Sequence, residues 1–329
     1  MASGLLGISE GTDGGGSIRI PAAWCNVVGF KPSFGRVPFV SRPNGFGGTN
    51  PFLFEGALTR SVADAALGLQ VLCGPDSRDP YSSRDDDDFL RSLGRSIKGL
   101  RVAFSPDMGV YPVDPEVASV VAKAVGAFEE CGASVFESSL VLPHDQRELS
   151  DLWCRLIGTP EALIGLKDEG YDLLGAHRSD LPDEYLYWVE KAFTRTVLDL
   201  SADQVMRTSV FDAIQSVFDT ADLLVTPTVG CLPVLNAEDG NTLGPTEING
   251  IQVDPCIGWC LTYVFNFTGH PAVSVPAGLS ANGLPVGLQI IGRIGDDATL
   301  IAAASAFEHA RPWSGNYKLR KVNRGESTQ

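Results

Sequence analysis

Apolar and polar positions along this chain switch repeatedly between the spacing typical of helices and that typical of strands. The clearest helix follows Ser61, which together with Asp64 fits a variant of the capping box. The apolar positions after it continue to Leu72. Gly74 is expected to end this helix in the left-handed conformation.

A βαβ unit is predicted next. Leu100–Phe104 has the composition of a buried strand, and Asp114 followed by Pro115 is typical of a helix start. Gly132 is expected to close that helix before a second strand over Ser134–Glu137. A right-handed crossover between these strands would make them parallel.

The remaining segments continue the alternation, which favours an α/β architecture. Residues 145–220 are predicted to be mostly helical, and residues after Lys318 are expected to fray. The other predicted elements are short strands at Leu223–Val225, Ala272–Val275 and Val286–Ile291, a turn at Asn282-Gly283, and a last helix capped by Asp297 that runs to about Ala310.

Composition and charge exclude several classes of protein. A hydrophobic content of 44% is ordinary for a soluble globular domain and excludes a disordered or fibrous chain. The net charge of −15 argues against a nucleic-acid partner, which would need a basic face. No signal peptide and no apolar run of bilayer-spanning length are visible, so we expect a cytoplasmic protein without a membrane partner.

No metal site is expected. The seven cysteines are odd in number and form no C-x-x-C pair, which is typical of reduced thiols. Cys256 and Cys260 are a weak zinc signal because no other ligand lies near them. The run Asp85–Asp88 precedes Phe89-Leu90 and fits the acidic first turn of a helix without any ion.

The loop Gly14-Gly15-Gly16-Ser17 carries the candidate chemistry. Glycines allow backbone N–H groups to converge on one point, where an oxyanion could form beside the Ser17 hydroxyl. A phosphate-binding P-loop would need a lysine where Gly16 stands, and no G-x-G-x-x-G pattern is present, so nucleotide binding is disfavoured. None of the four histidines falls in a motif that points to Ser17 as its base.

Four segments resemble the amidase signature family. Gly11–Pro38 matches its long glycine–serine segment almost position for position, and Thr59–Ala66 resembles a second one. The lead-in Glu55–Leu58 departs modestly from the family pattern. Asn266–Ala272 and Gly283–Gln289 resemble segments near the end, so the resemblance covers nearly the whole chain.

The resemblance implies a fold, an activity and a set of site residues. The fold is a mixed central sheet enclosed by helices, taken as a single domain over residues 1–329 and incomplete on its N-terminal side. The activity is hydrolysis of carbon–nitrogen bonds in small-molecule amides, with no metal or organic cofactor. The implied site comprises Ser17 as the acylated nucleophile, Gly14, Gly15 and Gly16 with the Ser17 amide as the oxyanion hole, and Asp13 and Arg19 as supports, held by a bidentate charge-assisted pair.

The family's base system would lie outside this sequence. A second serine, reached through a cis peptide, relays the proton to a neutral lysine, and both would precede Met1. Ser3 and Ser9 lie too close to Ser17 to replace that serine, and Lys31 belongs to a segment that we interpret as structural. We therefore expect a truncated amidase with little turnover. The alternative is a catalytically silent binding or subunit protein of the same fold.

The substrate is less well determined by the sequence. Candidate pocket walls are Trp153, Trp259, Cys260 and Tyr263, for which packing in the core is the competing interpretation. Which amide is bound stays open, and so does a homodimer.

Overall fold

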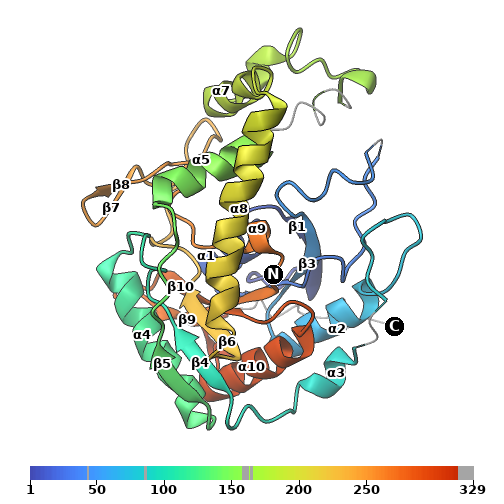
Figure 1. Cartoon of the computed structure of the whole chain (residues 1–329). Coiled ribbons are helices and arrows are strands. Elements are labelled where there is room, and N and C mark those ends of the chain that lie inside the picture. The colour runs from blue at the N-terminus through green and yellow to red at the C-terminus, as the bar shows by residue number, and fades with distance from the viewer. Residues whose placement is uncertain (43, 85–86, 158–162, 164–165, 318–329) are drawn as a thin grey trace, which may run out of the picture.

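The computed structural model describes residues 1–42, 44–84, 87–157, 163 and 166–317. These residues form an eight-stranded sheet with helices on both of its faces, and a separate two-stranded ribbon (Figure 1). The strands of the large sheet are β1 (Ile8–Asp13), β2 (Val28–Lys31), β3 (Phe54–Thr59), β4 (Arg101–Phe104), β5 (Ser134–Glu137), β6 (Leu223–Pro227), β9 (Ala272–Leu279) and β10 (Pro285–Ile291), and the ribbon consists of β7 (Glu247–Ile248) and β8 (Ile251–Gln252).

The sheet is mixed, as predicted. Its strands lie in the order β1-β3-β2-β9-β10-β6-β4-β5. Pairing is antiparallel from β1 to β6 and parallel where β4 meets β6 and β5. The predicted parallel βαβ unit is therefore confirmed, and β1 lies at one edge of the sheet with β3 as its neighbour.

Two layers of helices cover the sheet. The helices are α1 (Arg19–Trp24), α2 (Val62–Leu72), α3 (Phe89–Ser92), α4 (Pro115–Glu130), α5 (Gln146–Ile157), α7 (Asp183–Ala192), α8 (Val197–Val217), α9 (Val264–Thr268) and α10 (Asp297–Ala310), with 3-10 turns at Arg178–Asp180 and Ser314–Asn316. Leu223 and Val225 of β6 pack with α2, α4 and α10, whereas Leu224 packs with α5, α8 and α9. The period of two along a strand thus separates two hydrophobic clusters.

Most predicted helix starts are confirmed. The Ser61 hydroxyl accepts from the Asp64 amide, and Asp114 caps α4 with Pro115 at its first position. Asp88 is the N-cap of α3 and accepts from the Arg91 amide, whereas the first turn itself holds no acidic residue. Residues 85 and 86 lie outside the described residues.

One predicted helix end and one predicted helix start need correction. Gly74 has a φ of +140°, outside the left-handed helical region, and α2 already stops at Leu72. The Gly74 amide instead donates to the Arg36 carbonyl, so this residue bonds outside the helix. Asp296, not Asp297, caps α10, because Asp297 accepts from the amide of Ser33.

The observed end of β9 also differs from the prediction, because β9 pairs with β10. β9 continues four residues beyond Val275 to Leu279, opposite β10, and the predicted Asn282-Gly283 turn joins these strands. Residues 145–220 are mainly helical where they are described, and residues 318–329 lie outside the described part. Among the described helices, none combines the length and apolar character needed to traverse a bilayer.

Candidate active site

The glycine–serine loop leaves the sheet where β1 ends. Asp13 is the last residue of β1, and α1 begins at Arg19, so residues 14–18 turn the chain from edge strand to helix. Asp13, Gly15 and Gly16 are buried, whereas Ser17 is exposed to solvent. The serine hydroxyl is thus accessible, while the backbone behind it is enclosed.

Three hydrogen bonds fix the peptide planes of this loop. The Gly14 carbonyl accepts from Trp153 Nε1 at 2.8 Å, and the Gly15 carbonyl accepts from Thr262 Oγ1 at 2.5 Å. The Gly16 carbonyl accepts from the Ile20 amide at 2.7 Å. In a trans peptide the N–H points opposite to its C=O, so these anchors also orient the next amide along the chain.

The amides oriented in this way are free to bind an external acceptor. Those of Gly15, Gly16 and Ser17 donate to no other described residue. Fixed, unpaired N–H groups beside a serine hydroxyl are what stabilisation of an oxyanion requires.

Close contacts explain the glycines themselves. A Cβ on Gly15 would lie 2.7 Å from the indole of Trp153. Gly16 has a φ of +131°, and a Cβ there would overlap the Thr262 hydroxyl. The loop therefore tolerates no side chain at the two positions that its anchors enclose.

Asp13 and Arg19 form a bidentate ion pair beneath the loop. The guanidinium donates from Nε to one Asp13 oxygen at 3.0 Å and from Nη2 to the other at 2.9 Å, and both side chains are completely buried. Burial alone would raise the pKa of Asp13, but the charge and hydrogen bonds of Arg19 outweigh it and hold this pKa below its usual value. The expected pair is present.

Two further side chains and one backbone carbonyl complete this network, and their residues were not among the predicted site residues. Arg19 also donates to Asn266 Oδ1 at 2.7 Å, to Gln289 Oε1 at 3.2 Å and to the Thr262 carbonyl at 2.9 Å. Asn266 in turn donates to the Asp13 carbonyl at 2.8 Å. Asn266 and Gln289 stand within the motifs noted at the sequence level, but only the fold shows what they contact.

The predicted pocket residues separate into two groups. Trp153 on α5 contacts the loop directly, through the bond to Gly14. Trp259 is nearly buried and stacks on Trp24 of α1, with ring centroids 4.7 Å apart. Cys260 and Tyr263 have no exposed surface and lie in the hydrophobic cluster around α8 and α9. Their burial gives no support to a role as pocket walls.

No described side chain is hydrogen-bonded to the Ser17 hydroxyl. The histidines are engaged elsewhere: His144 with Ser209, His177 with Asp180, His270 with Thr268 and Gln215, and His309 with the Ser305 carbonyl. A histidine base at Ser17 is therefore absent from the described part of the chain.

Lys31 is a completely buried amine whose charge interacts with those of Arg19 and Asp13. Its Nζ donates to the His270 carbonyl at 2.5 Å and lies 3.6 Å from the centre of the Phe54 ring. Burial lowers the pKa of Lys31 well below its usual value, the charge of Arg19 lowers it further, and Asp13 and Asp297 oppose that shift. These contacts place the amine in the core, against backbone and an aromatic ring.

Comparisons with known proteins agree with this architecture. Residues 1–301 match the family model described as amidase. The chain is 35% identical over 318 residues to an acylamidase of Rhodococcus erythropolis, covering 95% of this chain and 63% of that protein. It is 32% identical over 327 residues to a subunit of the glutamyl-tRNA(Gln) amidotransferase of Thermodesulfovibrio yellowstonii, covering 92% of this chain and 63% of that protein.

Solved structures share the fold of this chain. A bacterial aryl acylamidase of the amidase signature family superposes with a TM-score of 0.93 at 49% identity, covering 96% of this chain and 64% of that one. A 6-aminohexanoate cyclic dimer hydrolase superposes with a TM-score of 0.74 at 26% identity, covering 93% of this chain and 65% of that one. The chain thus spans a little under two thirds of the length of these relatives, and it belongs to the amidase family.

Proposed function

We propose that Ser17 is the nucleophile of an amide hydrolase, and that the Gly15, Gly16 and Ser17 amides bind the oxyanion of its tetrahedral intermediate. The observation that carries this proposal is the set of three amides that are oriented by anchored carbonyls and left unpaired beside an exposed serine. Gly14 contributes its carbonyl to this anchoring. Asp13 and Arg19 act as supports beneath the loop.

In this reaction the Ser17 oxygen forms a bond to the carbonyl carbon of the amide. Collapse of the intermediate breaks the carbon–nitrogen bond and releases the amine, which takes up a proton. Water then attacks the acyl-serine, releases the carboxylic acid and restores the hydroxyl. Trp153, which lies against the loop, is the wall residue that we retain from the predicted pocket.

Among the described residues, no side chain is hydrogen-bonded to Ser17 as a base beside the proposed anion site. The resemblance assigns that role to a serine and a lysine that have no counterpart in this sequence. We therefore propose that this chain by itself acylates slowly, since general-base assistance contributes roughly 10²–10⁴ to the rate of such steps. The second candidate is a non-catalytic binding or subunit protein, favoured by the unpartnered Ser17 hydroxyl.

Intact-mass spectrometry with a fluorophosphonate tests the proposal. The Ser17 oxygen would displace fluoride from phosphorus, and the serine proton would pass to solvent. A single adduct that Ser17→Ala removes and Ser3→Ala retains supports a nucleophilic Ser17. No adduct from a folded sample would overturn an activated serine in this chain and support the non-catalytic candidate.

The amide class can be tested separately. The relatives named acylamidase and aryl acylamidase lead us to propose N-acylated aromatic amines as substrates. With 4-nitroacetanilide, acylation of Ser17 would release 4-nitroaniline, which is followed by its absorbance. Ser17→Ala is the control, and release that persists in it would contradict the assignment.

A further inference from the structure

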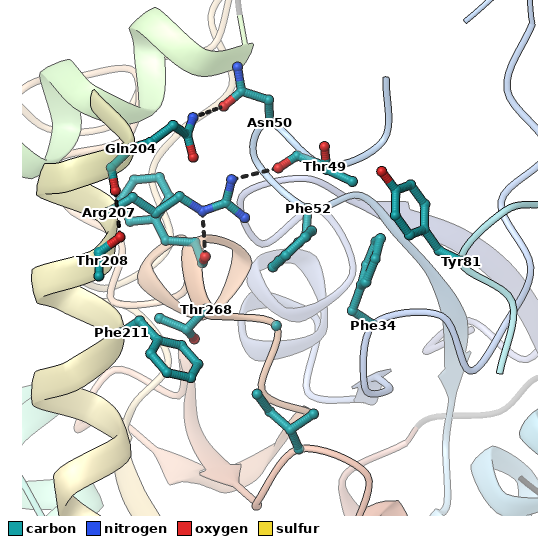
Figure 2. A pocket seen from close by; sticks show the side chains of 13 residues that line it. Phe34, Thr49, Asn50, Phe52, Tyr81, Gln204, Arg207, Thr208, Phe211 and Thr268 are labelled. Carbon is teal, nitrogen blue, oxygen red and sulfur yellow. Dashed lines mark hydrogen bonds between the residues drawn. The ribbon is translucent and has the colours of Figure 1, made fainter. Parts of the chain in front are cut away.

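A second candidate site lies away from the serine loop, between α8 and the segment that leads into β3. It is an open cavity with a volume of about 860 Å³. Figure 2 shows the side chains that line it. None of its described lining residues belongs to the Gly14–Ser17 loop. This volume is in the range of small-molecule sites.

Aromatic rings form much of the wall. Phe34 and Phe52 stack with ring centroids 4.2 Å apart, and Tyr81 lies 5.4 Å from Phe34. Phe211 faces the same cavity from α8 (Figure 2). Such walls favour a flat apolar group over a purely polar ligand.

Arg207 is the one charged residue among the thirteen that line the described cavity. Its Nε donates to the Phe267 carbonyl at 2.6 Å and its Nη1 to the Thr49 carbonyl at 2.5 Å, while the Phe52 ring lies 4.2 Å from the guanidinium carbon. No described carboxylate pairs with it. Among the described residues, the partners of this charge are two backbone carbonyls and the face of the Phe52 ring.

One nitrogen of this guanidinium lacks an acceptor. Arg207 is 8% exposed, and its buried Nη2 has no hydrogen-bond partner. Burial lowers the pKa of Arg207 to about 10, which leaves the group protonated at neutral pH. An unpaired buried N–H is costly, and a carboxylate is the acceptor that a guanidinium binds best.

From this cavity we infer that the protein binds an aromatic carboxylate, whose carboxyl group accepts from Arg207 and whose ring packs against Phe211 and the edge of Phe52. Thr208 at the rim is neutral, and its hydroxyl donates to the Gln204 carbonyl at 2.7 Å (Figure 2). No acidic side chain lines the described cavity, so nothing on the wall repels an anion, even though the net charge of the chain is −15.

The site also touches the network beneath the serine loop. Arg207 binds the Phe267 carbonyl in α9, and Asn266, the preceding residue, contacts both Asp13 and the Phe52 carbonyl. The two sites therefore share one short helix, although their lining residues differ.

Calorimetric titration with benzoate tests the inference, in a Ser17→Ala host so that the result is independent of acylation. We expect a Kd on the order of 1 mM for a ligand of this size. Benzamide, which has the same shape without the charge, is expected to bind at least about tenfold more weakly. Equal binding of benzoate and benzamide would overturn the inference.

Two pairs of variants locate the binding. Arg207→Gln should abolish it, whereas Arg293→Gln should not, because Arg293 likewise binds two backbone carbonyls and lies over a phenylalanine but is not among the lining residues. Unchanged binding in Arg207→Gln refutes the site. If Arg207→Gln does not fold, variants of the exposed Thr208 test the site instead. Thr208→Glu should weaken benzoate binding severalfold relative to Thr208→Gln. Equal binding in these two variants would refute the site.

Discussion

Arg19 holds Asp13 by two parallel hydrogen bonds of 3.0 and 2.9 Å, with neither side chain exposed to solvent. The carboxylate also accepts from the Ile18 amide at 3.4 Å, so the pair spans the loop from the strand before it to the helix after it. Arg19 reaches the Thr262 carbonyl as well, and Thr262 anchors Gly15. The ion pair thus joins both ends and the middle of the loop.

Replacing Asp13 by asparagine should destabilise the fold strongly. The buried Arg19 guanidinium would keep its charge and lose its counter-ion, a change that typically costs about 3–5 kcal/mol. Urea unfolding at neutral pH measures the loss. Asp222→Asn is the control, because Asp222 pairs with Arg101 near the surface and should cost at most about 1 kcal/mol. Equal losses in the two variants would show that burial of the Asp13 pair has no special weight.

Gly16→Ala should cost more stability than Gly74→Ala. Both glycines have a similar positive φ, +131° and +140°, but a Cβ meets nothing within 4 Å at Gly74 and overlaps Thr262 at Gly16. Backbone strain alone is worth about 1–3 kcal/mol, so this comparison isolates the steric part. Urea unfolding gives both values. If the two losses agree, Thr262 adjusts freely and does not anchor the loop.

Local chemistry explains why part of the fold was predictable. Ser61 and Asp64 interact three residues apart, and Asp114 caps the helix that begins at Pro115. Both helix starts therefore follow from the local sequence. The start of α10 does not follow from the local sequence, because two aspartates stand side by side there. The contact of Asp297 with Ser33, 264 residues away, decides which of them caps the helix.

The same distinction applies to the candidate site. The glycines, Ser17, Asp13 and Arg19 lie within one segment of the sequence, and the expected ion pair is found. Thr262 bonds to Gly15 across 247 positions, and no spacing along the chain indicates that contact. Tyr263, the next residue, was predicted as a pocket wall and is completely buried at the start of α9, and residue type alone does not predict that burial.

Glu55→Gln should raise stability at alkaline pH and leave it unchanged in acid. Burial and the nearby Glu10 raise the pKa of Glu55 to about 7 from its ordinary 4.5. The folded state therefore binds a proton that the unfolded state has lost, so stability falls as pH rises from 4.5 to 7 and stays lower above it. A glutamine side chain at position 55 is uncharged at every pH. We expect a gain in Tm on the order of 1 °C at pH 8 and none at pH 4.

Thermal unfolding across that pH range tests Glu55→Gln, with Glu137→Gln on the exposed edge strand β5 as its control. The control measures what replacing a carboxylate on the surface does to Tm at each pH. A gain for Glu55→Gln that is as large at pH 4 as at pH 8 would contradict the raised pKa.

Lys31→Met should flatten the dependence of stability on pH below about pH 10. Burial lowers the pKa of Lys31 in the folded state, so in this window the unfolded chain binds the additional proton and stability rises with pH. One such group contributes up to about 1.4 kcal/mol per pH unit. Methionine fills a similar volume without titrating. Urea unfolding at pH 7 and pH 9.5 measures the slope, and Lys123→Met on the exposed face of α4 should leave it intact. A slope that survives Lys31→Met would mean that Lys31 stays protonated against the His270 carbonyl.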